Sequence, residues 1–310
     1  MLRVLVTGGA GFVGSHIVNG LIHQGHYPIV LDNMSTGKLQ NIQPYLESKA
    51  ATLIEGDICD PSTSRRAMAQ AEAVIHLAAL VDHETCLLDP ERANQVNGEG
   101  TRLMLEAARG NHVKRFVYAS SAAIYGATTA LPIDENVIPA PLSPYGSSKL
   151  TGERHCLNYR DRHELDVVCL RYFNIFGPRQ ASRQYSGVIT QFIAKLKESE
   201  SPIVNGDGEQ TRDFVSAQDV VKATLLALNS QQASGVYNIA TGKETSINQL
   251  ANLLIEISGQ KHIQPTYGPP REGEIRRSVA DIRKARTELG FVPETDLPRD
   301  FSQLWAWQVQ

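Results

Sequence analysis

Residues 2–14 read LRVLVTGGAGFVG, and this stretch decides the fold. Leu2 to Thr7 form a short apolar, β-branched run, which is typical of a strand buried in a parallel sheet. A glycine-rich turn follows and leads into a helical pattern near Ser15. Strand, glycine turn and helix in this order favour dinucleotide binding, because glycines let the backbone approach a pyrophosphate and a helix N-terminus offers unpaired N–H groups.

The choice of dinucleotide depends on the next strand. The apolar run from Tyr27 to Leu31 ends in Asp32. A carboxylate at this position can accept a hydrogen bond from a ribose hydroxyl, and it repels the 2′-phosphate of NADP. The sequence therefore favours NAD as the cofactor.

The composition excludes several classes of partner. The 310 residues are 42% hydrophobic, which suits one large domain or two modest ones, and the net charge is −3. We expect no general attraction to nucleic acid or to a membrane, so local arginines must hold any anionic ligand. Cys59, Cys86, Cys156 and Cys169 lack metal-ligand spacing, and we expect reduced thiols in a cytoplasmic protein without a metal.

Strand-like runs alternate with helical patterns through the first half of the chain. After Asp32 these runs lie at residues 53–58, 73–79, 115–121 and 166–172. The alternation predicts an α/β, Rossmann-type, doubly wound parallel sheet. We expect a first domain over residues 1–174, with segments near 216–240 returning to it, and a smaller C-terminal substrate-binding domain over residues 175–310. Ligands of such a sheet bind beyond the carboxyl ends of its strands.

Tyr145 and Lys149 stand four residues apart in SPYGSSK at 143–149. On a helix, this spacing puts both side chains on one face. Tyrosine is a weak base at neutral pH, but a nearby ammonium group favours the phenolate and lowers the pKa. We therefore predict that Tyr145 accepts a proton from a sugar or alcohol hydroxyl, with Ser121 as its partner at a strand end.

Together these segments resemble the extended short-chain dehydrogenase/reductase superfamily. More narrowly, they resemble its NAD-dependent nucleotide-sugar 4-epimerases of the UDP-glucose and UDP-N-acetylglucosamine type. The resemblance is carried by TGGAGFVG at 7–14, LDN at 31–33, GDI at 56–58, HLAA at 76–79, VNGEGT at 96–101, SSAAIYG at 120–126, SPYGSSK at 143–149, LRYFNIFGPRQ at 170–180, NGDGEQTRDFV at 205–215 and REGEIRRSVADI at 271–282.

The resemblance implies a mechanism and a cofactor site. Tyr145 takes the proton of the sugar 4-OH, Ser121 hydrogen-bonds the same oxygen, and Lys149 holds the nicotinamide ribose. Hydride passes to NAD⁺, the 4-keto sugar rotates to present its other face, and hydride returns to that face. The implied NAD-binding residues are Gly8, Gly11, Phe12, Val13, Gly14, Asp32, Asn33, Gly37, Asp57, Ile58, Leu77, Ala78, Ala79, Val81, Asn97, Tyr145, Lys149 and Tyr172.

The resemblance also implies a UDP-sugar site. Arg212 and Arg271 match the arginines that bind the diphosphate. The other implied substrate contacts are Asp82, Ser121, Ala122, Asn174, Val188, Val204, Asn205 and Ser278. Relatives restricted to glucose and galactose carry a tyrosine at the position of Ser278. A serine there leaves room for an acetamido group, so we expect UDP-GlcNAc and UDP-GalNAc as substrates, or UDP-Glc and UDP-Gal, or both pairs.

The sequence departs from the family pattern at Asp82-His83-Glu84, where relatives usually read Ser-Val-Pro. Asp82 could accept hydrogen bonds from sugar hydroxyls and would repel the carboxylate of a uronate, whereas His83 and Glu84 could equally lie in an exposed loop. The open alternatives are a UDP-glucuronate 4-epimerase, a reductase, a dehydratase and an NAD-binding scaffold without catalysis. Ala122 and Ala123 cannot transfer the protons that a dehydratase requires. The family implies a homodimer through helices near 94–109 and 147–161.

Overall fold

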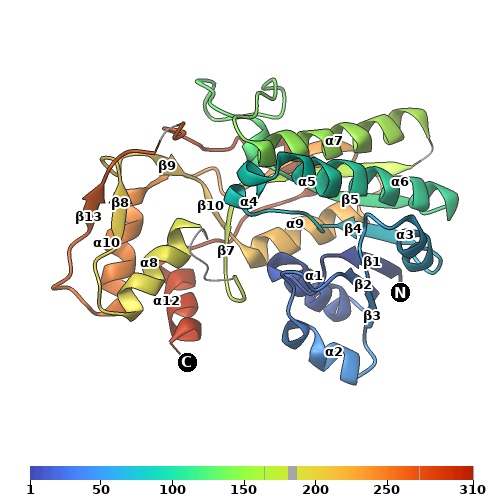
Figure 1. The fold of residues 1–310 in the computed structure, drawn as a ribbon, viewed down its shortest axis with the longest axis horizontal. Helices are drawn as coiled ribbons and strands as arrows, with labels where there is room; N and C mark the ends of the chain where they lie inside the picture. Colours follow the sequence, from blue (N-terminus) through green and yellow to red (C-terminus); the bar gives the residue numbers. More distant parts are fainter. Residues whose placement is uncertain (164, 181–186, 272, 310) are drawn as a thin grey trace.

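The structure is a computed structural model that describes residues 1–163, 165–180, 187–271 and 273–309. At its centre is a seven-stranded parallel sheet with the strand order β11-β6-β5-β4-β1-β2-β3 (Figure 1). Its strands are β1 (Arg3–Thr7), β2 (Tyr27–Asp32), β3 (Thr52–Glu55), β4 (Ala73–His76), β5 (Arg115–Ser121), β6 (Asp166–Tyr172) and β11 (Gly235–Ile239). The predicted doubly wound α/β sheet is confirmed.

Helices cover both faces of the sheet, because alternate residues of each strand point to opposite sides. In β1, Val4 and Val6 belong to one buried cluster, whereas Leu5 belongs to another. The first face is covered by α1 (Phe12–His23), α2 (Gln43–Glu47), α9 (Ala217–Asn229) and α11 (Arg283–Leu289). The second face is covered by α3 (Pro61–Met68), α6 (Thr101–Gly110) and α7 (Pro144–Arg162).

Short elements occupy the carboxyl edge of the sheet and the approach to α6. Two short helices, α4 (His83–Leu88) and α5 (Pro90–Asn94), follow β4, and a π-helical turn, η2 (Gln95–Gly100), joins α5 to α6. The 3₁₀ turns are η1 (Leu39–Asn41) and η3 (Ala122–Ile124). Both α4 and α5 lie against α7, so the segment after β4 packs close to the start of that long helix.

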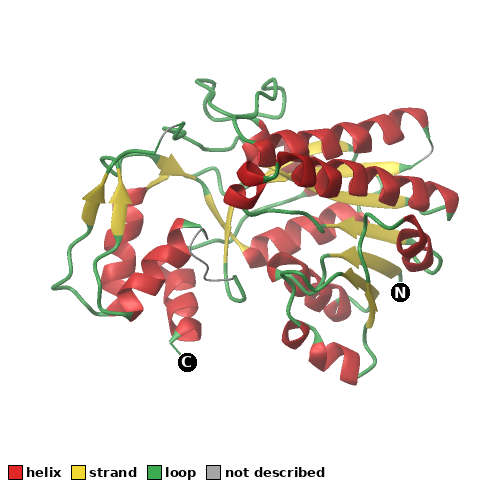
Figure 2. Ribbon diagram, in the orientation of Figure 1, coloured by secondary structure: helices red, strands yellow, loops and turns green. Residues whose placement is uncertain are grey.

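A second lobe lies beside the sheet (Figure 1, Figure 2). It has its own apolar core, which includes Phe176, Phe192 and Phe301. Its helices are α8 (Val188–Lys197), α10 (Ile247–Ser258) and α12 (Leu297–Gln308). Its strands are β7 (Asn174–Phe176), β8 (Ile203–Asn205), β9 (Thr211–Arg212), β10 (Phe214–Ser216), β12 (Thr245–Ser246) and β13 (Thr266–Gly268). They pair two by two, as β7 with β10, β8 with β13 and β9 with β12. Among the described residues, no helix has the length and apolar character that crossing a membrane requires.

A buried ion pair connects α7 to the sheet. Glu153 on α7 meets Arg171 on β6 at 2.6 Å, and their side chains are only 2% and 5% exposed. Ser120 on β5 donates a hydrogen bond to the same carboxylate at 2.5 Å, and Arg171 also donates to the Tyr125 hydroxyl at 2.8 Å. Three segments of the protein therefore share one buried pair of charges.

We expect Glu153→Gln to lower the free energy of unfolding by about 3 kcal/mol, because a buried charge that loses its partner is strongly destabilising. Denaturation by urea measures this loss. The matched control is Glu106→Gln, which breaks the exposed pair with Arg102 and should cost less than about 1 kcal/mol. Equal losses in the two variants would contradict the role of the buried pair.

Candidate active site

The structure brings Ser121, Tyr145 and Lys149 together at the carboxyl edge of the sheet. Ser121 is the last residue of β5, and Tyr145 and Lys149 lie in the first two turns of α7. The helix begins where it does because Ser143 accepts a hydrogen bond from the Gly146 N–H at 3.1 Å and Pro144 follows as the first helical residue. A side-chain hydrogen bond links Tyr145 to Ser121. These groups can bind a hydroxyl and move its proton.

The electrostatics of this group differ from our expectation. Burial raises the pKa of Tyr145, and the hydrogen bond with Ser121 opposes this effect only in part. The prediction that Lys149 lowers the Tyr145 pKa is therefore wrong for the protein chain alone. The reason is geometric: the Lys149 ammonium lies over the ring of Tyr118, 4.5 Å from its centre. Burial also lowers the pKa of Lys149 to about 8, against the opposing charge of Glu153.

The side chain of Asn97 makes several hydrogen bonds within the protein chain. It lies in the π-helical turn η2, is 1% exposed, and donates both amide hydrogens, to the Leu80 carbonyl and the Ser148 hydroxyl, at 2.9 Å each. Its amide oxygen accepts from the Leu80 N–H at 2.7 Å. The Asn97 side chain therefore connects the segment after β4 to α7 beside Lys149, and it has no N–H left for a cofactor.

The glycine turn after β1 is tight enough to exclude side chains. A Cβ atom at Gly14 would lie 2.1 Å from the Gly8 carbonyl oxygen, and one at Gly8 would lie 2.9 Å from the Ala78 nitrogen. Gly8 also has a φ of 70°, which disfavours other residues. At the start of α1, Gly11 brings no side chain to cap the helix. The turn and the uncapped helix end fit a pyrophosphate, as the sequence predicts.

Asp32 lies beside this turn. Its carboxylate accepts hydrogen bonds from the N–H groups of Ala10 and Met34, both at 2.9 Å. A Cβ atom at Gly37 would come within 2.9 Å of the same carboxylate. The acidic group is thus fixed next to the glycine turn and within a close-packed loop. This arrangement fits the ribose of an adenine dinucleotide, and it leaves little space for an additional phosphate.

The other predicted cofactor residues lie at neighbouring strand ends. Asn33 donates to the Asp57 carboxylate at 3.1 Å, so the ends of β2 and β3 are joined. Tyr172, by contrast, belongs to the sheet core and shares a hydrogen bond with Thr224 on α9 at 2.8 Å. The remaining predicted residues begin α1 (Phe12 and Val13), follow β3 (Ile58) or follow β4 (Leu77, Ala78, Ala79 and Val81).

Two arginines of the second lobe, Arg212 and Arg271, belong to the candidate substrate site. Arg212 donates to the carbonyls of Thr211 and Ile275 and pairs with Glu274. Burial lowers the pKa of Arg212, and the positive charge of Arg271 lowers it further. The two guanidinium groups are therefore close enough to repel each other, and an anion between them would relieve this repulsion.

The remaining predicted substrate residues are spread over both lobes. Arg271 donates to the Asn205 amide oxygen from two guanidinium nitrogens, at 3.1 Å each. Asn174 begins β7 directly after the sheet, and Ala122 begins η3 directly after Ser121. Val204 and Ser278 are buried, and Val188 is the first residue of α8. The described residues contain no cluster of His, Cys, Asp or Glu that could hold a metal.

The atypical segment after β4 is a helix rather than a loop. Asp82 caps α4, because its Oδ1 accepts from the Thr85 N–H at 2.8 Å and from the Thr85 hydroxyl at 2.6 Å. The sequence did not predict this capping role, and the contact of Asp82 with sugar hydroxyls stays a prediction. The sequence reasoning also missed the position of His83, whose ring lies 4.8 Å from the Tyr145 ring, measured between centroids. The Asp-x-x-Thr capping pattern was the available signal for the helix.

Comparison with known proteins places this geometry in context. Residues 4–240 match the profile of the NAD dependent epimerase/dehydratase family. The chain is 35% identical to a UDP-glucose 4-epimerase from Mycolicibacterium smegmatis, over 96% of this chain and 95% of that relative. A crystal structure of UDP-glucose 4-epimerase from Thermotoga maritima with UDP-glucose has a TM-score of 0.93, with 37% identity and 99% coverage of both chains.

A second solved structure is similarly close. It is a UDP-N-acetylglucosamine 4-epimerase from Methanobrevibacter ruminantium in complex with UDP-N-acetylmuramic acid. Its TM-score is 0.94 at 34% identity, over 99% of this chain and 98% of that one. The likeness therefore extends over both lobes.

We expect Gly14→Ala to weaken NAD binding by about tenfold or more, because the added methyl group would collide with the Gly8 carbonyl and open the turn. Isothermal titration calorimetry with NAD measures this change. Gly110→Ala at the end of α6 is the control, because a Cβ atom there meets nothing within 4 Å. An unchanged NAD affinity in a folded Gly14→Ala protein would refute the placement of the pyrophosphate.

Proposed function

The chain belongs to the NAD dependent epimerase/dehydratase family, and we propose that it inverts C4 of a UDP-sugar. The observation that carries this proposal is the convergence of Ser121, Tyr145 and Lys149 at one strand edge. The glycine turn beside Asp32 supports NAD as the cofactor, and the two close arginines of the second lobe support a diphosphate in the substrate.

Proton transfer is the step that these side chains perform. Tyr145 takes the proton from the sugar 4-OH, and Ser121 holds the same oxygen through its hydroxyl. The chemistry that bound NAD would supply is acceptance of hydride from C4 and its return to the opposite face of the sugar. Because burial raises the Tyr145 pKa, the phenolate depends on added positive charge nearby. Lys149 remains largely an ammonium at neutral pH, because its pKa is about 8, and it is placed to bind a ribose.

The diphosphate would bind at Arg212 and Arg271. Arg212 already has a carboxylate partner in Glu274, which carries the same sign of charge as a phosphate. Guanidinium groups suit phosphate because they offer two parallel donors. We propose that residues 1–174, with the segments returning near 216–240, bind NAD and that residues 175–310 bind the nucleotide sugar. The packing of α9 and β11 against the central sheet supports this division.

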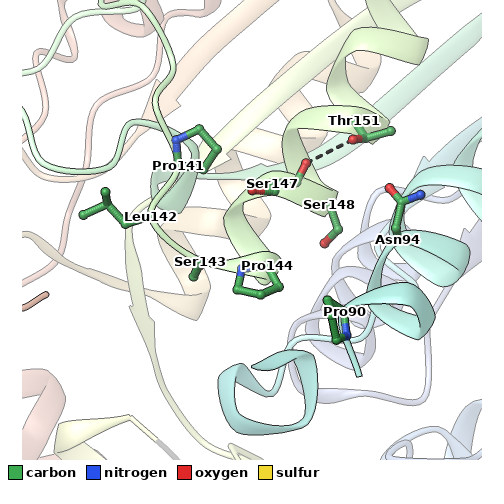
Figure 3. Close-up of a pocket in the computed structure, with 9 residues that line it drawn as sticks. All are labelled: Pro90, Asn94, Pro141, Leu142, Ser143, Pro144, Ser147, Ser148 and Thr151. Atoms are coloured by element: carbon green, nitrogen blue, oxygen red, sulfur yellow. Dashed lines mark hydrogen bonds between the residues drawn. The ribbon is translucent and has the colours of Figure 1, made fainter. Parts of the chain in front are cut away.

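We also infer a homodimer that forms through α6 and α7. A hollow of about 500 Å³ between α5 and the start of α7 is lined by residues that include Pro90, Leu142 and Ser147 (Figure 3). Tyr145 and Lys149 do not line it. The nearby Leu88 and Leu142 side chains are 81% and 62% exposed, which suits burial against a second copy. The free cysteines support a reducing, cytoplasmic setting.

No observation on the described residues favours one of the alternative reactions. A dehydratase requires acid and base groups beside Tyr145, but η3 presents Ala122 and Ala123 at this place. A uronate would bring its carboxylate towards Asp82. A reductase would consume one reduced cofactor for each turnover, whereas 4-epimerisation regenerates its cofactor.

We expect Tyr145→Phe to lower kcat by about 10²–10⁴-fold, because a positioned base typically contributes this much. NMR of the products from UDP-GlcNAc, UDP-Glc and UDP-GlcA measures inversion at C4. Tyr159→Phe on the same helix should leave the rate unchanged. A fully active Tyr145→Phe variant would exclude this tyrosine as the base, and a wild-type protein that binds NAD but inverts none of the three sugars would exclude epimerisation of those substrates.

We expect Ser278→Tyr to abolish activity on UDP-GlcNAc and to preserve most activity on UDP-Glc. Ser278 is buried, so a tyrosine would fill the space that an acetamido group requires. The ratio of kcat/KM for the two sugars is the measurement, and Ser278→Ala serves as the control for loss of the hydroxyl. Equal losses on both sugars would show that this position does not select for sugar size.

A further inference from the structure

His83 is a side chain at the candidate active site that the mechanism leaves without a role. It is the first residue of α4, and its ring contacts Tyr145 with a centroid distance of 4.8 Å and an angle of 52° between the ring planes. As a whole residue, His83 is exposed to solvent. The imidazole therefore covers one side of the tyrosine that we propose as the base.

The local structure fixes the position of His83. Asp82 caps α4 through Thr85, and Cys86 in the same helix is buried and directs its thiol to the Leu80 carbonyl at 3.6 Å. The helix also packs on α7. Because the Asp82 cap, the buried Cys86 and the packing on α7 fix this short helix, the imidazole is pre-organised against the Tyr145 ring.

The ring nitrogens of His83 are available for hydrogen bonds to a ligand. Among the described residues, neither nitrogen forms a hydrogen bond, and the contact with Tyr145 is made by the ring. Loss of water on the packed side lowers the pKa of His83, although the Asp82 carboxylate opposes this effect. The lowered pKa favours the uncharged imidazole at neutral pH, which has one donor and one acceptor nitrogen.

We propose that His83 binds the sugar ring of the substrate and is a specificity-determining residue of this site. The inference rests on the proposed function, because it takes the sugar 4-OH to lie at the Tyr145 hydroxyl. The 3-OH, on a carbon next to C4, or the 6-OH would then lie beside the imidazole. His83 hydrogen-bonds this hydroxyl, and Tyr145 and Ser121 hold the 4-OH.

A neutral imidazole suits a reaction that must bind a sugar in two orientations. The donor and the acceptor nitrogen can each pair with a hydroxyl, which is itself both donor and acceptor. A charged side chain would bind a hydroxyl more strongly and hold one orientation in preference. His83 therefore adds affinity for the sugar without fixing which face is presented.

Calorimetry with UDP and with UDP-glucose separates this role from simple packing. His83→Phe keeps an aromatic ring on Tyr145 but removes both nitrogens. We expect it to weaken UDP-glucose binding by about tenfold, which corresponds to one lost hydrogen bond, and to leave the Kd of UDP unchanged. His83→Gln restores a donor and an acceptor and should bind UDP-glucose within about threefold of the wild type. His262→Phe, at an exposed and remote histidine, is the control.

Three outcomes would overturn the proposal. The first is an unchanged Kd for UDP-glucose in His83→Phe, and the second is an equal loss for UDP and UDP-glucose. The third is a Gln variant as weak as the Phe variant, with both retaining wild-type NAD affinity as evidence of folding. Because binding is measured without turnover, failure of the proposed epimerisation shows separately, as a wild type that binds UDP-glucose but does not invert C4.

Discussion

The buried pair of Glu153 and Arg171 holds the candidate active site in register. Glu153 lies one helical turn after Lys149, and Ser120, which donates to Glu153, directly precedes Ser121. The carboxylate therefore fixes the distance between the serine at the end of β5 and the first turns of α7. Since a desolvated ion pair tolerates little displacement, it also keeps Ser121, Tyr145 and Lys149 in fixed relative positions. Arg171 also donates a hydrogen bond to the hydroxyl of Tyr125, the residue directly after η3, and so connects the ion pair to that turn.

In the protein chain alone, burial disfavours the charged forms of the side chains at this rigid site. It raises the pKa of Tyr145 and lowers that of Lys149, so both groups are pushed towards their neutral forms. The hydrogen bond from Ser121 is too weak to reverse the shift of Tyr145. If NAD⁺ binds as we propose, its cationic ring would supply the missing positive charge beside the phenol. The base would then be activated only when the hydride acceptor is also in place.

The sequence predicts the sheet well because its signals are local. Apolar β-branched runs, the glycine turn and the acid at Asp32 each lie within a few residues, and the structure places them as the pattern indicates. The short pairings of the second lobe, such as β8 with β13, join distant segments and leave no local signal. The direction of the Lys149 ammonium towards Tyr118 and the full engagement of Asn97 also depend on tertiary contacts. For the same reason His83 could be read as a loop residue.

The two lobes offer different kinds of contact, charged groups for the diphosphate and uncharged groups for the sugar, and this division suits inversion at C4. The net charge of −3 gives no general attraction for an anion, so we propose that Arg212 and Arg271 hold the diphosphate locally. At the sheet edge, the side chains that we propose to contact the sugar, Ser121, Ala122 and His83, carry no fixed charge, whereas the Lys149 ammonium is assigned to the ribose of the cofactor. Strong binding of the diphosphate can then anchor the substrate, whereas the sugar meets only hydrogen bonds of modest strength. A sugar held in this way can turn between its two faces without leaving the protein.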